Sequence, residues 1–321
     1  MKQSLTFPDP CSLSIVIAVF NGARSIPELC RRLTEVLATR AAPFEIILVN
    51  DCSRDHSWEV IEQLAADGPG VRGINFMRNY GQHNALLCGI RAARYAAIVT
   101  MDDDLQHAPE EIPGLLERLN EGFDVVYGTP ESERNGFLRG IASYVTRLAL
   151  RAAVGADVAK NVSAFRVFRT QLRDAFRNYQ APFVSIDVLL TWGTTRFAAK
   201  KVPFQSRSYG ASNYTFGKLV RHALDMMTGF STAPLQLASL IGFACTLFGL
   251  GVFVYVVGCY FAQGSIPGFP FLASIIAIFC GAELFALGVM GEYLARMHFR
   301  TMDRPVYTVR NGSGESELPE Q

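Results

Sequence analysis

The feature that most constrains this chain is a long segment that carries no charged residue. Between Met226 and Ala282 there is no Asp, Glu, Lys or Arg, although the 321 residues include 30 Lys and Arg and 29 Asp and Glu. Inside this segment, residues 235–261 are long enough to cross a bilayer, which takes about 20 apolar residues. Residues 269–287 form a second, shorter stretch, which contains Glu283. The sequence therefore predicts two transmembrane helices joined by a short uncharged loop.

Basic residues flank the outer ends of this predicted hairpin. Because cytoplasmic segments of membrane proteins carry an excess of Lys and Arg, we expect both ends of the hairpin to face the cytoplasm of a bacterial inner membrane. The alternative is a buried helical hairpin in a soluble protein. Glu283 would face the other helix, lie near the interface or be protonated, since an ionisable group is costly within a bilayer. The flanking basic residues are Arg207, Lys218 and Arg221 before the pair and Arg296, Arg300, Arg304 and Arg310 after it.

Before Met226 the chain alternates between strand and helix patterns. Short runs of apolar and β-branched residues are each followed by a segment whose apolar residues have helical spacing. Such strands, alternating with helices, are typical of a mostly parallel sheet covered on both faces, so we predict an α/β domain. The predicted strands are 13–19, 44–49, 71–76, 96–101 and 124–127, and the predicted helices are 26–38, 57–66, 84–93 and 109–120.

Polar residues follow three of the predicted strands at the point where each strand ends. They are Asn21 after Phe20, Asp51 after Asn50, and the three aspartates at 102–104. In open parallel sheets, ligands bind beyond the carboxyl ends of the strands. The sequence therefore predicts a substrate cleft at this edge of the sheet.

The run MDDDLQ at residues 101–106 predicts a metal site. In an extended segment side chains alternate, so Asp102 and Asp104 would point one way and Asp103 the other. Gln106 continues on the side of the first two. Carboxylate and amide oxygens suit Mg²⁺ or Mn²⁺ better than Zn²⁺, and Mg²⁺ usually completes its shell with water and substrate phosphates. The alternative is a solvated turn that ends the strand.

Charge, cysteine content and the first residues argue against a nucleic-acid partner, a disulfide framework, a zinc site and a signal peptide. A formal net charge of +1 gives no basis for a nucleic-acid partner. The seven cysteines form no CxxC pair, which argues against a disulfide framework and against a zinc site. The first 12 residues contain no apolar stretch, so we expect no cleaved signal peptide.

Several short motifs, taken in order, resemble those of a known family. The motifs are AVFN at 18–21, LVNDCSRD at 48–55, RNYGQH at 78–83, MDDDLQ at 101–106, RSYGASNY at 207–214 and GEYLAR at 291–296. With the two-span tail, they resemble the family 2 glycosyltransferases of GT-A fold, and more narrowly the polyprenyl-phosphate glycosyltransferases. That group includes dolichol-phosphate mannose synthase, bactoprenol glucosyltransferases and undecaprenyl-phosphate aminoarabinose-type transferases. The resemblance covers almost the whole chain. It implies a Rossmann-like GT-A domain, a nucleotide-sugar donor (a UDP-sugar by default) and an undecaprenyl or other polyprenyl phosphate acceptor.

The resemblance also implies roles for individual residues. The positions that match nucleotide-binding residues are Ala18, Phe20, Asn21, Asp51, Ser53, Asp102, Asp103 and Asp104. The positions that match the metal and diphosphate site are Asp102, Asp104 and Gln106. Contacts to the diphosphate or the lipid phosphate are expected from Arg134, Arg139, Arg207 and Ser212, with a solvated loop as the alternative for the first two. The expected catalytic residues are Asp102, Asp104 and Arg207.

Five positions depart from the family pattern. Gly22 stands where the family usually has Glu, Asp103 where it has a small residue, and Asn50 where it has the first of two aspartates. Lys160 stands where the family has Asp, and Asn213 where it often has Lys. The change at Gly22 bears on how the nucleotide is held, and the change at Lys160 bears on how the acceptor is positioned.

These expectations combine into a membrane-anchored, inverting glycosyltransferase that uses Mg²⁺ or Mn²⁺. The alternatives are a different lipid or polysaccharide acceptor, or a non-catalytic membrane scaffold that binds nucleotide sugars. Helices near 140–154 and 214–232 are expected to lie in the membrane interface, or else to be ordinary surface helices. The expected divisions are a GT-A domain at 1–232, a transmembrane hairpin at 233–294 and a cytoplasmic tail at 295–321. Related proteins suggest a homo-oligomer, such as a tetramer.

Overall fold

The computed structural model describes residues 11–40, 42–68, 70–131, 161–181, 184–205, 233–263, 268–302 and 305–313. Several of the predictions fall outside these ranges and are not addressed by the structure. They are the interfacial helices near 140–154 and 214–232, and the residues Arg134, Arg139, Lys160, Arg207, Ser212 and Asn213.

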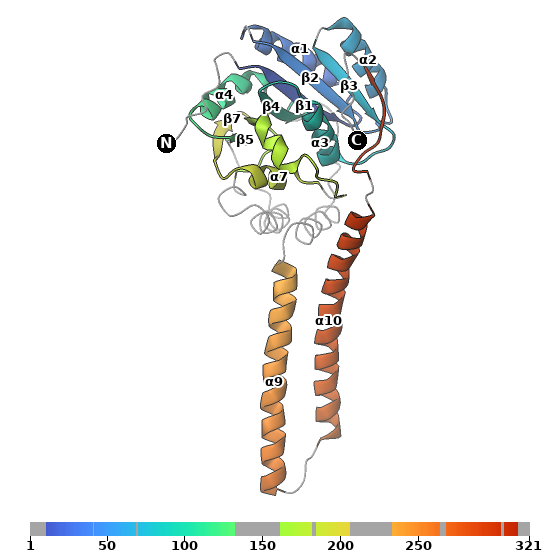
Figure 1. Ribbon diagram of the computed structural model, residues 1–321, viewed down its shortest axis with the longest axis vertical. Helices are drawn as coiled ribbons and strands as arrows, with labels where there is room; N and C mark the ends of the chain where they lie inside the picture. The colour runs from blue at the N-terminus through green and yellow to red at the C-terminus, as the bar shows by residue number, and fades with distance from the viewer. Residues whose placement is uncertain are drawn as a thin grey trace.

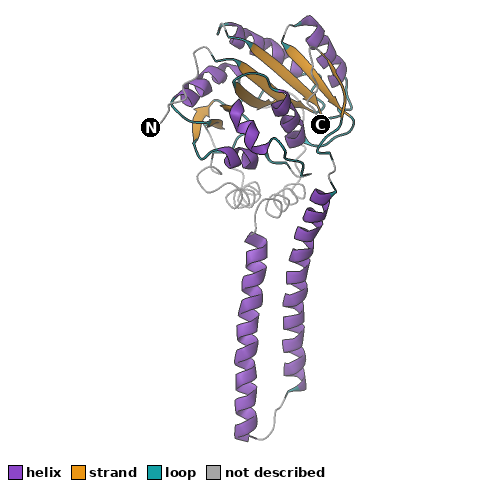
Figure 2. Cartoon of the chain, viewed as in Figure 1, coloured by secondary structure: helices purple, strands orange, loops and turns teal. Residues whose placement is uncertain are grey.

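An eight-stranded sheet forms the centre of the domain (Figure 2). Its order is β7-β5-β6-β4-β1-β2-β3-β8, and all pairs are parallel except those that involve β6 and β8. The predicted mostly parallel sheet is thereby confirmed, with β6, β7 and β8 as strands that the sequence did not predict. The strands are β1 (Leu13–Val19), β2 (Phe44–Asn50), β3 (Val71–Phe76), β4 (Ala97–Asp102), β5 (Val125–Pro130), β6 (Arg166–Arg169), β7 (Phe197–Val202) and β8 (Val309–Ser313).

Helices cover both faces of the sheet, as its apolar strands require (Figure 1). One hydrophobic cluster joins the sheet to α1 (Ile26–Ala38), α2 (Ser57–Asp67) and α4 (Ile112–Asn120). A second cluster joins the opposite face to α3 (Gln82–Ala92) and α7 (Ile186–Gly193). A 3-10 helix precedes one helix on each face: η1 (Pro109–Glu111) lies before α4 and η2 (Thr170–Phe176) before α7.

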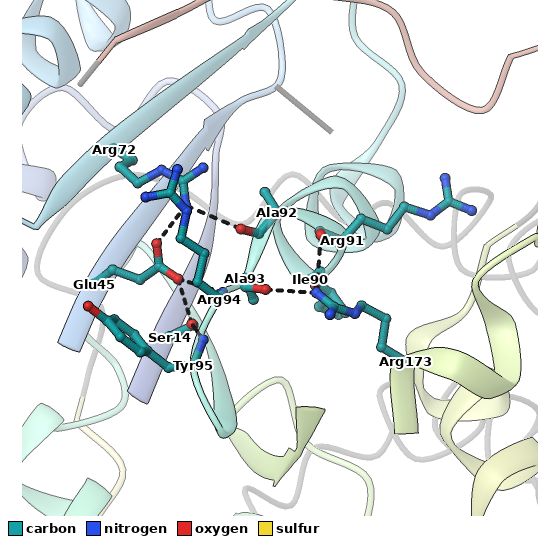
Figure 3. A network of polar contacts seen from close by, with 10 residues as sticks. All are labelled: Ser14, Glu45, Arg72, Ile90, Arg91, Ala92, Ala93, Arg94, Tyr95 and Arg173. Carbon is teal, nitrogen blue, oxygen red and sulfur yellow. Dashed lines mark hydrogen bonds and ion pairs between the residues drawn. The ribbon is translucent and has the colours of Figure 1, made fainter. Parts of the chain in front are cut away.

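Arginine side chains fix the C-terminal end of α3 (Figure 3). The Nη1 atoms of Arg72 and Arg173 together donate hydrogen bonds to the four carbonyl oxygens of residues 90–93, at 2.7–3.3 Å. The last carbonyls of a helix lack intrahelical partners and carry the negative end of its dipole, so cations are favoured there. Arg72 is buried, and its charge is paired with Glu45, whose carboxylate lies 2.6 Å away. These contacts hold α3 at a fixed position along the sheet.

Two long apolar helices extend away from the sheet domain (Figure 1). They are α9 (Ala233–Gln263) and α10 (Phe269–Thr301), and both contain a stretch long and apolar enough to cross a membrane. Their large apolar side chains are exposed, for example Phe243 at 63% and Phe253 at 64%. This contradicts the alternative of a buried hairpin in a soluble protein. At 31 and 33 residues the helices are roughly 45–50 Å long, which exceeds the roughly 30 Å of a bilayer core.

The chain returns to the sheet after α10. Strand β8 pairs antiparallel with β3, and the backbone N–H of Met77 donates to the carbonyl of Thr308 at 3.0 Å. Ahead of β8, the ring of Tyr307 stacks on Phe76 with 5.3 Å between centroids. Helix α10 runs to Thr301, and part of the segment 295–321, expected as a cytoplasmic tail, is a strand of the sheet. The chain after the hairpin is thus held to the sheet domain by strand pairing.

Gly73 in β3 makes room for this returning strand. A Cβ atom at this position would overlap Ser313 Oγ and would lie 2.5 Å from Ile61 Cγ2 and 3.2 Å from the Trp58 ring. We expect Gly73→Ala to lower the free energy of unfolding by about 1–3 kcal/mol through overpacking, measured by denaturant unfolding of the purified protein. Gly68→Ala is the matched control, because its Cβ would meet only ordinary contacts at 3.4 and 3.6 Å. Equal losses in both variants would contradict the packing of β8 against β3.

Candidate active site

The ends of β1, β2 and β4 lie side by side at one edge of the sheet. Val19 of β1 is in register with Asn50 of β2, and Ala18 of β1 is in register with Asp102 of β4. The backbone N–H of Asp51 donates to the carbonyl of Val19 at 2.9 Å, which extends this pairing into the loop. The polar edge predicted from the sequence is confirmed.

Each of the three loops at this edge contains a residue in the left-handed region of backbone space. Asn21 after β1 has φ 57°, Cys52 after β2 has φ 54° and Leu105 after β4 has φ 60°. Within the described ranges these are the only non-glycine residues with positive φ. Such conformations cost free energy and concentrate at functional sites, where the surrounding structure holds them in place. Their coincidence marks this edge as the candidate site.

The loops after β1 and β2 are joined by hydrogen bonds. The backbone N–H of Asn21 donates to Ser53 Oγ at 3.0 Å, and Asn21 Oδ1 accepts from the backbone N–H of Arg54 at 2.8 Å. Two of the predicted nucleotide-binding residues, Asn21 and Ser53, are thus in direct contact. Phe20 is 42% exposed beside them and Ala18 is half-buried. The predicted nucleotide residues of β1 and β2 therefore form one surface.

Asp51 is buried and holds the start of α3. Its two carboxylate oxygens accept hydrogen bonds from the backbone N–H groups of Tyr80 at 2.7 Å and Gly81 at 2.8 Å. Burial raises the pKa of this carboxyl, and the two backbone hydrogen bonds oppose the rise. The sequence did not predict this structural role, because Asp51 and Tyr80 are 29 residues apart and only the packed structure brings them together. The contact of Asp51 with a nucleotide stays a prediction.

Gln82, the first residue of α3, contacts the predicted metal site. Its Nε2 donates to Asp102 Oδ1 at 2.6 Å. Because α3 is held by Asp51 at its start and by arginines at its end, it places this amide against the carboxylate. Sequence reasoning gave Gln82 no role, although the residue lies in the RNYGQH motif; only the position of α3 relative to β4 reveals the contact.

The three consecutive aspartates lie where β4 ends, but not in the extended segment expected from the sequence. Asp102 is the last residue of β4, and the chain turns at Asp103 and Asp104 before the left-handed Leu105. The alternation argument is therefore wrong beyond Asp102, because a turn does not alternate its side chains. Within the turn, Asp104 Oδ1 accepts from the backbone N–H of Gln106 at 3.1 Å. Asp102, Asp104 and Gln106 are all half-buried.

Asp103 points beneath the loop after β1. The backbone N–H of Phe20 donates to its carboxylate, and its Oδ2 is shielded from solvent, with no hydrogen-bond partner among the described residues. Burial raises the pKa of this carboxyl to about 7, and the charges of Asp102 and Asp104 add to the rise. A Cβ at Gly22 would overlap Asp103 Oδ2. The two departures from the family pattern at 22 and 103 therefore meet in space.

A buried ion pair fixes β6 between β4 and β5. Arg166 of β6 pairs with Asp187 of α7, which also accepts from the Tyr127 hydroxyl at 3.0 Å, and Arg166 Nε donates to Thr100 Oγ1 at 3.0 Å. Because both partners are buried, the pair holds the segment that precedes β6 next to the end of β4. Arg166 of the family-like segment 160–166 thus has a structural role here.

Comparisons with known proteins agree with this architecture. The model of the family described as Glycosyl transferase family 2 matches residues 14–178 of this chain. An undecaprenyl-phosphate 4-deoxy-4-formamido-L-arabinose transferase of Klebsiella pneumoniae (strain 342) is 32% identical over 95% of this chain and 95% of its own. The chain belongs to glycosyl transferase family 2. A transferase of the same description from Shewanella sediminis is 33% identical over 93% of this chain and 92% of its own.

A solved structure shares the fold of this family 2 glycosyltransferase. Glucosyl-3-phosphoglycerate synthase from Mycobacterium tuberculosis, in complex with Mn²⁺, UDP-glucose and phosphoglyceric acid, has a TM-score of 0.50 and 18% identity. The match covers 68% of this chain and 78% of that chain. It confirms the fold of the sheet domain.

The donor atoms of this glycosyltransferase suit a hard divalent cation that binds few protein groups. Among the described residues, no group of three or more His, Cys, Asp and Glu side chains is arranged to hold a metal. The expected ligands, the carboxylates of Asp102 and Asp104 and the amide of Gln106, lie at the end of β4 and in the turn after it, and their binding of a metal stays a prediction. Burial is the main cause of the raised pKa of Asp103, and repulsion from Asp102 and Asp104 adds to it; a cation beside these carboxylates would offset that repulsion. Two carboxylates, with substrate phosphates as the remaining ligands, fit Mg²⁺ or Mn²⁺.

The contact between Gly22 and Asp103 predicts that substitutions at the two positions depend on each other. We expect Gly22→Ala to lower the free energy of unfolding by about 1–3 kcal/mol, because the new methyl group overlaps a buried carboxylate. Adding Asp103→Ala removes that carboxylate, so the double variant should recover most of the loss. Denaturant unfolding of both single variants and the double variant gives the coupling energy. Strictly additive effects would show that the two residues do not meet.

Proposed function

We propose that this glycosyltransferase moves a sugar from a nucleotide-sugar donor to undecaprenyl phosphate at the membrane surface. The proposal rests mainly on how much of the chain is similar to its relatives. Relatives named as undecaprenyl-phosphate transferases match 93–95% of the chain, which includes the apolar hairpin as well as the sheet domain. A lipid acceptor explains the presence of the hairpin, because the hairpin would anchor the sheet domain at the membrane surface, where the lipid headgroup lies.

The donor nucleotide is proposed to lie at the ends of β1, β2 and β4. Asn21 and Ser53 already form a joined surface there, and Phe20 offers an exposed ring for a base. Asp102, Asp104 and Gln106 would hold Mg²⁺ or Mn²⁺, which when bound stabilises the charge on the departing diphosphate. Gln82 restrains the Asp102 carboxylate from α3. A UDP-sugar is the favoured donor.

The acceptor needs little activation in this proposal. A phosphate monoester is ionised at neutral pH, so its oxygen attacks the anomeric carbon without a strong general base. Orientation and charge stabilisation then supply the rate, and a single displacement inverts the anomeric configuration. This accounts for a working site with Lys160 in place of the family's Asp. Arg134, Arg139, Arg207 and Ser212 are proposed to contact the lipid phosphate or the diphosphate.

The proposed topology places the sheet domain and both ends of the hairpin in the cytoplasm. Strand β7, before α9, and strand β8, after α10, belong to one sheet, which supports a topology with both ends of the hairpin on the same side of the membrane. The excess of Arg and Lys at these ends indicates the cytoplasmic side of a bacterial inner membrane. The proposed topology is therefore that of a multi-pass protein with an even number of spans and a cytoplasmic active site. Assembly into a tetramer stays a prediction.

A donor screen tests the proposed reaction. Purified full-length protein is incubated with undecaprenyl phosphate, Mn²⁺ or Mg²⁺, and a panel of UDP-, GDP- and dTDP-sugars led by UDP-4-deoxy-4-formamido-L-arabinose. We expect lipid-dependent release of one nucleoside diphosphate. Asp104→Asn should lower the rate at least about 100-fold, because it removes a charge at the diphosphate site. Asp67→Asn, at an exposed carboxylate near the end of α2, should leave the rate unchanged.

Three outcomes would contradict the proposal. Release that does not depend on the lipid would indicate a different acceptor. Equal rates for Asp104→Asn and Asp67→Asn would show that Asp104 has no role in the reaction. Absence of release with every donor, lipid and metal would indicate a binding scaffold rather than an enzyme of this specificity.

A further inference from the structure

A chain of side-chain hydrogen bonds crosses the sheet from the returning strand β8 to the candidate donor loops. Asn75 Nδ2 of β3 donates to Asn311 Oδ1 of β8 at 3.1 Å, and Asn50 Nδ2 of β2 donates to Asn75 Oδ1 at 2.9 Å. Asn50 Oδ1 accepts from Ser53 Oγ at 2.5 Å. Ser53 Oγ in turn accepts from the backbone N–H of Asn21 at 3.0 Å. Three neighbouring strands and the loop after β1 are thereby connected.

The direction of this chain is fixed by a backbone group. The N–H of Ser53 can only donate, and it lies 3.3 Å from Asn50 Oδ1, so Asn50 must present its oxygen to the loop. Its amide nitrogen then faces Asn75, which must present an oxygen and send its own nitrogen toward Asn311. Asn311 therefore needs only an acceptor oxygen. With Asp at position 50, Asn75 would have to turn its nitrogen toward that carboxylate, and Asn311 would then have to donate rather than accept.

Burial makes the chain sensitive to the loss of one member. Asn50 and Asn75 are 3% and 7% exposed, whereas Asn311 on the edge strand is exposed, so it is the two buried amides that would be largely deprived of water after losing a partner. Strand pairing enforces the alignment, because Asn50 is in register with Asn75 and Asn75 with Asn311. Gly73 and the stacked rings of Phe76 and Tyr307 hold β8 in that register.

We infer that Asn311, acting through Asn75 and Asn50, is a positioning residue for the nucleotide of the donor. Strand β8, which follows α10, then contributes to the geometry of the donor site. This inference rests on the proposed function, because it takes the Asn21–Ser53 surface as the nucleotide site. It goes beyond that function by assigning a role to a residue that lies after the membrane hairpin in sequence.

Nucleotide binding by the full-length protein in detergent tests the inference without knowledge of the sugar. The affinities for UDP, GDP and dTDP are measured by calorimetry in the presence of Mn²⁺. Asn311→Leu should weaken the binding of the preferred nucleotide about three- to tenfold, the value of one lost hydrogen bond. Asn311→Asp keeps the acceptor oxygen and should bind as the wild type does. In turnover assays, Asn311→Leu should raise the KM for the donor and leave kcat and the KM for undecaprenyl phosphate unchanged.

A second pair of variants separates the hydrogen-bond chain from general damage to the strand. Asn75→Asp still accepts from Asn50, and the amide of Asn311 can turn to donate to it, so this variant should bind nearly normally. Asn75→Asp combined with Asn311→Asp sets two carboxylates against each other and should weaken binding more than tenfold. This pair still decides the question if Asn311→Leu does not fold.

The outcomes distinguish the inference from the proposed function. A wild type that binds none of the three nucleotides would contradict both. A wild type that binds one of them, with Asn311→Leu equal to it, would overturn the inference alone. Equal loss in Asn311→Leu and Asn311→Asp would also overturn it, because the acceptor oxygen would then be irrelevant.

Discussion

The parallel hydrogen bonding of β1 to β2 on one side and to β4 on the other brings three strand ends to the same level of the sheet. Each end continues into a loop with one residue in the left-handed region, so the backbone turns sharply and exposes polar groups at the edge. Asn21, Ser53 and the aspartates at 102–104 reach the same place for this reason alone. A shift of one residue in either pairing would separate them and reverse their faces.

Helix α3 adds a side chain, Gln82, to the candidate site at the strand ends. Asp51 holds its first turn, and Arg72 and Arg173 hold its last carbonyls, so the helix cannot slide along the sheet. Its first residue, Gln82, therefore meets Asp102 at a fixed position. Near the other end of the chain, β8 adds an edge strand to the sheet by pairing with β3, so the chain returns to the sheet domain after the apolar hairpin. In the proposed function, the hairpin anchors the domain near a lipid acceptor while the nucleotide binds at the edge of the sheet.

Much of this could be predicted from the sequence, and the failures have identifiable causes. The five early strands are runs of β-branched and apolar residues buried on both faces, which is the strongest local signal for a parallel sheet. Strand β8 reads VRNGS and has no such signal, because its place depends on Gly73 and on pairing with β3 far away in sequence. The three aspartates were found, but the turn that starts at Asp103 was not, since the left-handed conformation of Leu105 leaves no mark in the sequence. The contacts of Gln82 with Asp102 and of Gly22 with Asp103 join residues that only the packed structure brings together.

The most direct test of this account is an experimental structure of the full-length protein with UDP and Mn²⁺ bound. The account predicts that the diphosphate and the ion lie against Asp102 and Asp104, and that the nucleoside lies on the surface formed by Phe20, Asn21 and Ser53. A nucleotide bound at the opposite edge of the sheet, or away from the ends of β1, β2 and β4, would contradict it.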